Sequence, residues 1–228
     1  RVALDEAELR LAAEKLRDEK VEAIVICFLH SYRNPSHEKR AREIVLSVLP
    51  DVYVSISSSI LPEFREFERL STTVLNAYMG PRMDRYLERL IGRVHDIGID
   101  ANLDTVHSNG GLMSVPTVKE MPVRTCVSGP AAGVIGAAVI GEEAKFKNLV
   151  TFDVGGTSTD VSVIVDGKPL FASNRMVADY PVKTPMVDIH VIGAGGGSIA
   201  AVDDANALKV GPRSAGADPG PVAYGLGG

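Results

Sequence analysis

The 228 residues include 24 Lys and Arg, 29 Asp and Glu and two Cys, with a net charge of −5 at neutral pH. A chain of this length buries roughly 70% of its unfolded surface, so it needs no disulfide or metal ion to fold. The longest apolar run, Ala23 to Leu29, is too short to cross a bilayer, and no Lys/Arg block marks a phosphate-backbone contact. We therefore expect neither a membrane nor nucleic acid as a partner.

The cysteines and the chain ends add two expectations. Cys27 and Cys126 lie far apart and show no Cys-x-x-Cys or Cys/His spacing, which argues against a disulfide scaffold or a zinc module and favours the reducing cytoplasm. The chain begins at Arg1 rather than at a methionine and ends on Gly227-Gly228. We expect it to be a segment of a longer polypeptide.

The first quarter of the chain alternates between helical and strand patterns. Apolar residues at helical spacing predict a helix over residues 5–20, and the apolar run Val21 to Leu29 predicts a buried strand. Asn34 is a suitable N-cap for a second helix that Pro35 opens, and Val52 to Ser57 alternates as a second strand. This order predicts an α/β fold with a parallel or mixed sheet and covering helices.

Two further helices are predicted before the middle of the chain. They cover Glu63 to Tyr78 and Arg82 to His95, with a break at Gly80-Pro81, because proline opens helices more readily than it continues them. Along the first of them, charges at i,i+3 and i,i+4 spacing predict surface ion pairs, formed by Arg65, Glu66, Glu68 and Arg69. A strand from Leu103 to His107 then ends in the turn signal Asn109-Gly110-Gly111.

The second half is rich in glycine and in turn signals. Small residues from Gly129 to Ile140 predict a helix that approaches another backbone closely, for packing or for a ligand. Two apolar strands, Asn148 to Val154 and Asp160 to Val165, flank a Gly/Thr/Ser turn, and Asp166-Gly167 marks a second hairpin.

The sharpest motif is the stretch Thr151 to Asp160, set between those two strands. Adjacent glycines let backbone amides converge on an anion, and hydroxyls add donors, as in phosphate-binding nests. The acids Asp153 and Asp160 bracket the turn, where carboxylates beside a phosphate can hold Mg²⁺ or its waters. The nest itself is formed by Gly155, Gly156, Thr157, Ser158 and Thr159.

Other ligand motifs are weaker. No GxxxxGK[ST] sequence occurs, which excludes a P-loop. The stretch Gly195 to Ala200 fits the loose dinucleotide pattern, but no acidic residue follows at the required distance, so we interpret it as a second glycine-rich wall against a nucleotide. Cys126 has no identifiable base and is interpreted as a small buried residue. Asp203-Asp204 is interpreted as a solvated turn.

The Asp-x-Gly-Gly-Thr-x-x-Asp hairpin resembles the second phosphate motif of the actin-like ATPase superfamily, which includes sugar kinases. Within it, the chain resembles the A-type members of the hydantoinase/oxoprolinase family, which includes 5-oxoprolinase and the acetone and acetophenone carboxylases. The resemblance spans essentially the whole chain. It is carried by Phe28 to Tyr32, Leu61 to Glu66, Ser71 to Thr73, Ser108 to Gly111, Ser128 to Ala131, Val191 to Ile199 and Ser214 to Pro221.

The resemblance implies two RNase H-like, actin-like ATPase lobes of mixed sheets with flanking helices, incomplete at both ends. Residues 1–75 would be the C-terminal part of the first lobe and residues 76–228 the N-terminal part of the second. It also implies ATP and Mg²⁺, with Asp153 and Asp160 as the catalytic and metal-binding carboxylates. The cofactor-binding residues would be Gly155, Gly156, Thr157, Ser158, Thr159, Gly193, Gly195, Gly196, Gly197 and Ser198.

For function, the resemblance implies an ATP-dependent hydrolase component that opens a cyclic amide such as hydantoin or 5-oxoproline. The alternatives are a component of a ketone carboxylase and an ATPase activator or switch module. The family also implies a B-type hydantoinase subunit as partner. An earlier glycine-rich phosphate hairpin is expected upstream of Arg1, since no second Asp-x-Gly-Gly-Thr occurs. The segment alone is therefore expected not to turn over ATP.

Overall fold

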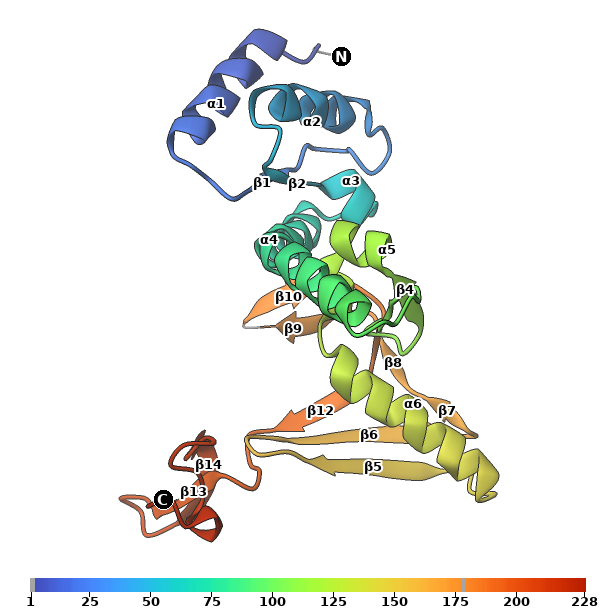
Figure 1. The fold of residues 1–228 in the computed structure, drawn as a ribbon, viewed down its shortest axis with the longest axis vertical. Coiled ribbons are helices and arrows are strands. Elements are labelled where there is room, and N and C mark those ends of the chain that lie inside the picture. The colour runs from blue at the N-terminus through green and yellow to red at the C-terminus, as the bar shows by residue number, and fades with distance from the viewer. Residues whose placement is uncertain (1–2, 178) are drawn as a thin grey trace. The chain divides into compact units, whose positions relative to one another are not determined.

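Most helical residues lie in the first half of the chain and most strands in the second half (Figure 1). The computed structural model describes residues 3–177 and 179–228. The chain forms two compact units. Unit 1 comprises Arg1–His107, Gly111–Cys126 and Ser173–Pro185, and unit 2 comprises Ser108–Gly110, Val127–Ala172 and Met186–Gly228. The mixed α/β class expected from the sequence is confirmed.

Unit 1 begins with the expected helix, strand, helix and strand. The helices are α1 (Glu6–Asp18) and α2 (Ser36–Val48), and the strands β1 (Ala23–Ile26) and β2 (Tyr53–Ile56) pair in parallel. The Asp5 carboxylate caps α1 by accepting from the amides of Ala7 and Glu8. Apolar side chains from all four elements form one core, made of Ala13, Ile24, Ile26, Ala41, Val45, Leu49 and Ile56.

The boundaries of these elements differ from the predicted ones by a few residues. The strand expected over Val21 to Leu29 is only four residues long, because the chain turns away after Ile26. Helix α2 begins at Ser36, one residue after Pro35, and the Asn34 side chain accepts from the Ser36 amide at 3.1 Å. The N-cap position is therefore Pro35 rather than Asn34 as predicted, and the Asn34 side chain accepts from the first helical amide.

The predicted break at Gly80-Pro81 is wrong. After the short α3 (Ser57–Ile60), a single helix of 31 residues, α4 (Glu66–Asp96), runs through Pro81. Packing on both sides of the proline explains this, since Gly80 lies where a Cβ would be 2.3 Å from the Tyr53 ring, and Leu87 is fully buried. Tertiary contacts thus outweigh the hydrogen bond that proline cannot make.

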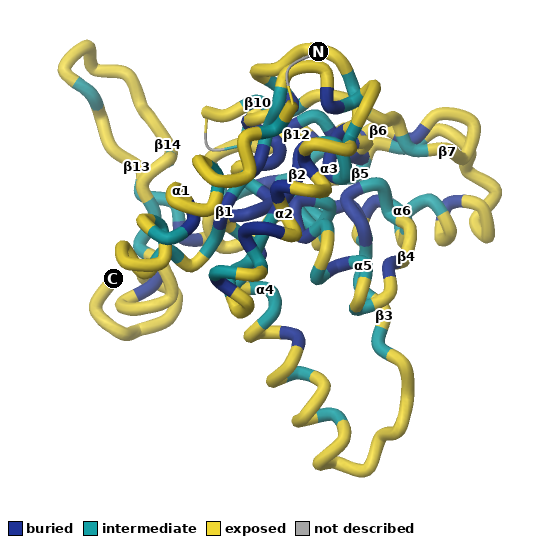
Figure 2. The backbone as a smooth tube through the Cα atoms, turned by 90° about the horizontal axis from the view of Figure 1, so that it is seen from above, coloured by how far each residue is buried: buried dark blue, intermediate teal, exposed yellow. Residues whose placement is uncertain are grey.

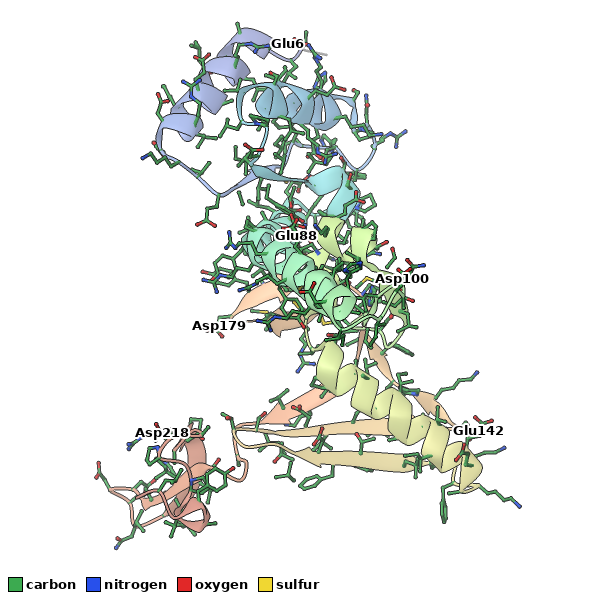
Figure 3. All side chains as sticks on the ribbon, in the orientation of Figure 1. Glu6, Glu88, Asp100, Glu142, Asp179 and Asp218 are labelled. Atoms are coloured by element: carbon green, nitrogen blue, oxygen red, sulfur yellow. The ribbon has the colours of Figure 1, made fainter. Side chains whose placement is uncertain are left out.

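The later part of α4 is mostly exposed, as the yellow turns of Figure 2 show. It is anchored by α5 (Val115–Glu120), whose Lys119 ammonium lies 3.1 Å from Glu88 and 3.3 Å from Asp84. Figure 3 labels Glu88 on this helix. Because both carboxylates are partly solvated, these ion pairs orient α5 more than they stabilise it.

Arg69 departs most from its predicted role. Arg65 and Glu68 do form the expected i,i+3 ion pair at 3.4 Å, but Arg69 is fully buried rather than part of a surface pair. Its guanidinium donates to the Ser57 hydroxyl and to the carbonyls of Phe28 and Glu63, at 2.8–3.2 Å. One side chain therefore joins the loops that follow β1 and β2.

Glu38, on α2, completes this polar cluster. Its carboxylate accepts from the Ser57 hydroxyl at 2.6 Å and from the amides of Phe28 and Ser58 at 2.8 and 2.7 Å. Burial alone would raise the pKa of Glu38, but these hydrogen bonds outweigh it and lower the pKa. Glu38 is therefore a buried anion at neutral pH, linked to Arg69 through Ser57.

Two hairpins and a short 3₁₀ helix complete unit 1. Strands β3 (Asp104–Val106) and β4 (Leu112–Ser114) flank the predicted Asn109-Gly110-Gly111 turn, which η1 (Pro122–Thr125) follows further on. The second hairpin pairs β9 (Arg175–Val177) with β10 (Tyr180–Val182). Just after β10, Lys183 forms an ion pair with Glu63. The Asn109-Gly110-Gly111 signal thus correctly predicted the hairpin of β3 and β4.

Unit 2 is built on an antiparallel sheet in the order β12-β6-β5, with α6 (Ser128–Glu143) across it (Figure 1). The strands are β5 (Leu149–Val154), β6 (Thr159–Val165) and β12 (Ile189–Ile192), and β7 (Lys168–Pro169) pairs with the end of β6 across the predicted Asp166-Gly167 turn. Ala131 and Val134 of the helix pack against the sheet in a core that also contains Ile164, Val187 and Ile189.

The remaining elements of unit 2 are short. Strands β8 (Phe171–Ala172) and β11 (Met186–Val187) pair with each other. Strands β13 (Ser198–Val202) and β14 (Leu208–Ser214) form a last hairpin, and η2 (Val222–Tyr224) follows. Packing explains one of the small residues of α6: a Cβ added at Gly141 would lie 2.3 Å from the Leu149 side chain.

Candidate functional site

The turn between β5 and β6 forms as the sequence predicts. Asp153 and Asp160 are direct cross-strand neighbours, and the Gly155 amide closes the turn by donating to the Ser158 carbonyl at 2.8 Å. Gly155, Gly156 and Thr157 are exposed at its tip. Among the described residues, the amides of Gly156 and Thr157 have no acceptor. The turn therefore presents backbone donors to solvent beside two carboxylates.

The glycine-rich loop before β13 lies directly against this turn. The amides of Gly196 and Gly197 donate to the carbonyls of Gly155 and Gly156, at 2.9 and 2.7 Å. Gly195 has to be a glycine here, because a Cβ would lie 2.5 Å from the Gly155 carbonyl oxygen. The structure thus brings together the two glycine-rich segments that the sequence singles out.

Several residues predicted to bind a cofactor have partners within the chain. The Thr159 hydroxyl is buried and donates to the Ala194 carbonyl at 2.6 Å, and the Ser198 hydroxyl accepts from the Gly195 amide at 2.8 Å. Gly193 faces Pro212 of β14: a Cβ added at Gly193 would lie 3.3 Å from the proline ring. These groups brace the loop, and their role toward a nucleotide stays a prediction.

Asp153 and Asp160 line a pocket of about 270 Å³ between the sheet and α6. Asp153 is exposed and Asp160 is half-buried. A Cβ on Gly133 of α6 would lie 4.0 Å from an oxygen of Asp153, so the glycine leaves that side of the carboxylate open. The rest of the lining comes from Pro130, Val134, Ala137, Thr151 and Phe152.

For the helix side of this pocket, the sequence left open whether the small residues serve packing or a ligand. Its residues 130, 133, 134 and 137 follow the i, i+3, i+4, i+7 spacing of one helix face. That spacing is visible in the sequence, but it does not distinguish a pocket wall from a packing surface. Whether this helix face lines a pocket depends on where β5 lies, and that position is known only from the folded structure.

The donor chemistry of the pocket suits a hard cation that takes other ligands from elsewhere. Within residues 3–177 and 179–228, no group of three or more His, Cys, Asp or Glu is arranged to hold a metal ion. Mg²⁺ commonly binds proteins through one or two carboxylates and completes its octahedron with water and phosphate oxygens. Asp153 and Asp160 fit that mode, and their role as metal ligands stays a prediction.

Two other candidates turn out to be structural. Asp203 accepts from the amides of Ala205 and Ala207 and pairs with Lys209 at 2.9 Å; the Lys209 hydrogen bond is the largest cause that lowers its pKa. It therefore organises the turn between β13 and β14. Cys126 is half-buried rather than fully buried as expected, and burial raises the pKa of its thiol, which disfavours the nucleophilic thiolate.

The close contact at Gly195 leads to a stability prediction. We expect Gly195→Ala to lower the free energy of unfolding by about 1–3 kcal/mol, because its methyl group would overlap backbone atoms that cannot rotate away. The adjacent Gly196→Ala is the matched control, since its nearest neighbour would be an ordinary 3.8 Å away. Urea unfolding of both variants measures the difference. Equal stabilities would show that the loop does not rest on the turn.

The sequence is similar to known proteins over nearly its whole length. The sequence model of the hydantoinase/oxoprolinase family matches residues 69–228, and that of its N-terminal region matches residues 1–49. The caprolactamase alpha subunit of Pseudomonas jessenii is 42% identical over 99% of this chain and 32% of its own length. The acetophenone carboxylase gamma subunit of Aromatoleum aromaticum is 38% identical over 99% of this chain and 31% of its own.

A solved structure extends the agreement to three dimensions. The ATP-dependent caprolactamase from Pseudomonas jessenii matches with a TM-score of 0.84 and 41% identity, over 99% of this chain and 33% of that one. This chain thus spans about a third of the length of these relatives. No helix among the described residues is both long and apolar enough to cross a membrane. Because the family model matches residues 69–228, which is more than half of the chain, the chain belongs to the hydantoinase/oxoprolinase family.

Proposed function

We propose that this chain is part of an ATP-dependent enzyme that opens a cyclic amide of the hydantoin or 5-oxoproline type. The observation that carries the proposal is the exposed turn at Gly155–Thr157, flanked by the Asp153–Asp160 pair and braced by the loop at Gly195–Gly197. Family membership and the ATP-dependent caprolactamase of similar structure support it.

In this proposal the turn holds the terminal phosphates of ATP. The free amides of Gly156 and Thr157 donate to phosphate oxygens, in the manner of a backbone nest. Asp153 and Asp160 hold Mg²⁺, which supplies neutralisation of phosphate charge when bound. Asp160 is alternatively a general base. Its half-buried position beside the pocket suits either role.

The chemistry explains why ATP is needed. Amide resonance makes a lactam carbonyl a poor electrophile. In the proposed reaction the carbonyl oxygen attacks the γ-phosphorus, the bond to the bridging oxygen breaks, and ADP leaves with that electron pair. Water then adds to the activated carbon, and the ring C–N bond breaks as nitrogen takes a proton, which gives an acyl phosphate. A second water releases phosphate and the carboxylate.

For such a phosphoryl transfer the protein mainly has to position the reactants and neutralise the phosphate charge. We assign residues 1–75 and 76–228 to parts of two RNase H-like, actin-like lobes; unit 1 extends past this boundary, since it also includes residues 76–107, 111–126 and 173–185. Helix α4 runs across that boundary without a break. The proposed enzyme works with a B-type subunit. The relatives named as caprolactamase and carboxylase subunits support a multi-subunit assembly.

The test is product analysis with the complete protein and its partner subunit. Phosphate release and ring-opened product are measured for hydantoin, 5-oxoproline, caprolactam, acetone and acetophenone, with and without bicarbonate. ATP cleavage stoichiometric with opening of a cyclic amide supports the proposal. ATP cleavage that requires a ketone and bicarbonate favours the carboxylase alternative, which the 38% identity to a carboxylase subunit motivates. Cleavage that responds to a protein partner alone favours an activator or switch module.

A further inference from the structure

The pocket under α6 lies on one face of β5 and β6 (Figure 1). Leu149 packs against the core beneath α6, so Thr151 and Asp153, at alternate positions further along β5, point to the same side of the sheet. Asp160 is the cross-strand neighbour of Asp153 and shares that face. The two carboxylates therefore lie on the helix side of the sheet, where the strands enter the turn.

These two carboxylates are the only side-chain groups of the pocket left to bind a ligand by hydrogen bonds. The Thr151 hydroxyl accepts from the Ser162 amide at 3.0 Å and donates to the Ser162 carbonyl at 3.3 Å. Asp153 and Asp160 have no hydrogen bond or ion pair within the part of the chain that the structure describes. Because ionised carboxylates accept and do not donate, a ligand here must bring a donor or a cation.

The remaining lining is apolar and the space is small. Pro130, Val134 and Ala137 form the helix wall of the pocket. Its volume of about 270 Å³ corresponds to roughly nine water molecules at ~30 Å³ each, whereas the adenosine of ATP has roughly twice that number of heavy atoms. The pocket therefore suits one compact ring rather than the base and sugar of a nucleotide.

The charge of the lining disfavours an anionic ligand. Among the described residues that line the pocket there is no lysine, arginine or histidine, and Asp153 and Asp160 are both acidic. A Mg²⁺ ion held by the pair would only neutralise it, and the phosphates of ATP would add negative charge beside it. The carboxylate of 5-oxoproline would meet no cationic side chain here, and juxtaposed like charges are costly.

We infer that this pocket binds the ring of an uncharged cyclic amide, whose ring N–H donates to Asp160 and whose size Gly133 limits. The inference rests on the proposed function and narrows its substrate to a neutral lactam or hydantoin. Asp160 is half-buried and Asp153 is exposed, so a hydrogen bond to Asp160 competes less with water. A carboxylate has two oxygens, so one can contact a metal ion while the other accepts the N–H. Ketones and lactones lack this donor.

Gly133 limits the ring because it is the position of the helix wall without a side chain. Glycine is unfavourable inside a helix, and no contact requires it here, since an added Cβ would first meet an oxygen of Asp153 at 4.0 Å. A larger side chain would extend into the pocket. Gly136 lies on the same helix, does not line the pocket and has open space around its Cβ position, which makes it the matched control.

Titration calorimetry on the complete protein, with its partner subunit and a non-hydrolysable ATP analogue, tests this inference. The probes are hydantoin, caprolactam, 5-oxoproline and caprolactone, which has the ring size of caprolactam but no N–H. We expect caprolactone and 5-oxoproline to bind at least about 10-fold more weakly than caprolactam. Gly133→Leu should weaken binding of caprolactam at least about 10-fold and leave the affinity for the ATP analogue unchanged. Gly136→Leu should leave both affinities unchanged.

Four results would overturn the inference. Equal binding of caprolactam to the unmodified protein and to Gly133→Leu would place the ring elsewhere. Equal binding of caprolactone and caprolactam to the unmodified protein would remove Asp160 as the acceptor, whatever the variant does. Binding of 5-oxoproline as tight as that of the neutral rings would remove the charge preference. Loss of affinity for the ATP analogue in Gly133→Leu would assign the pocket to the nucleotide.

The two proposals fail in different experiments. Each of those four results is compatible with ATP cleavage coupled to opening of a cyclic amide, so the proposed function would stand without the pocket assignment. Product analysis in which no cyclic amide is opened would instead overturn the proposed function, and the pocket assignment with it.

Discussion

Replacement of Asp153 with asparagine is expected to lower substrate-dependent ATP turnover by the complete enzyme at least about 10²-fold. Asparagine keeps the size of the side chain but removes the charge that would hold Mg²⁺ beside the phosphates, and loss of one preorganised electrostatic group typically costs 10²- to 10³-fold in rate. Steady-state phosphate release, measured at saturating Mg²⁺ and ATP, gives the effect on kcat.

The same variant should not lose stability, which separates a catalytic role from a structural one. Asp153 and Asp160 are like charges directly across two strands, an arrangement that costs roughly 0.2–1 kcal/mol. Asp153→Asn should therefore leave the free energy of unfolding unchanged or slightly raised. Asp166→Asn, at the exposed opposite end of β6, is the matched control and should turn over normally. Full turnover by Asp153→Asn would remove Asp153 from the mechanism.

Replacement of Arg69 with methionine is expected to give the largest loss of stability, about 3–5 kcal/mol in the free energy of unfolding. Methionine fills much of the volume but leaves the carbonyls of Phe28 and Glu63 without their donor, and it leaves the buried Glu38 carboxylate without the nearby cation. Urea denaturation of the complete protein, with the slope compared between variants, measures the loss.

Arg65→Met is the control for this prediction. Arg65 is the N-cap residue of the same helix, and its side chain is 62% exposed, so its ion pair with Glu68 should contribute less than about 1 kcal/mol. If both variants unfold at the same urea concentration, the buried cluster does not stabilise unit 1 as its hydrogen bonds suggest.

Arg69 also shows what the sequence can and cannot predict. Charge spacing on a helix predicts which residues are neighbours on its surface, and the Arg65–Glu68 pair confirms that rule. It does not predict which side of the helix meets the rest of the protein. Arg69 is buried because the loops after β1 and β2 meet at that point, and their meeting depends on residues distant in sequence.

The helix break at Gly80-Pro81 failed for a related reason. Local propensity opposes proline inside a helix by about 3 kcal/mol, and the prediction used that cost alone. In the structure Gly80 accommodates the Tyr53 ring, whose hydroxyl donates to the Lys119 carbonyl at 2.7 Å. Contacts of this kind hold the helix on both sides of Pro81, and no local pattern reports them.

The hairpin at Asp153–Asp160 was predictable because its signal is local. Two apolar strands, a glycine pair and flanking acids specify both the turn and the residues at its ends, and the structure has them in register. The contact between this turn and the loop at Gly195–Gly197 follows from a long-range pairing, of β12 with β6. The sequence predicted that both segments are glycine-rich walls, but not that they hydrogen-bond to each other.

That pair of backbone bonds has an energetic consequence for any anion bound there. The amides of Gly196 and Gly197 donate to the carbonyls of Gly155 and Gly156, so the two segments hold each other in place through hydrogen bonds within the chain. A binding partner then meets groups whose conformational entropy was already lost on folding, and little of its affinity is spent on arranging them. With such preorganisation, we expect the charge of the bound anion to determine its affinity, because the turn does not change its conformation on binding.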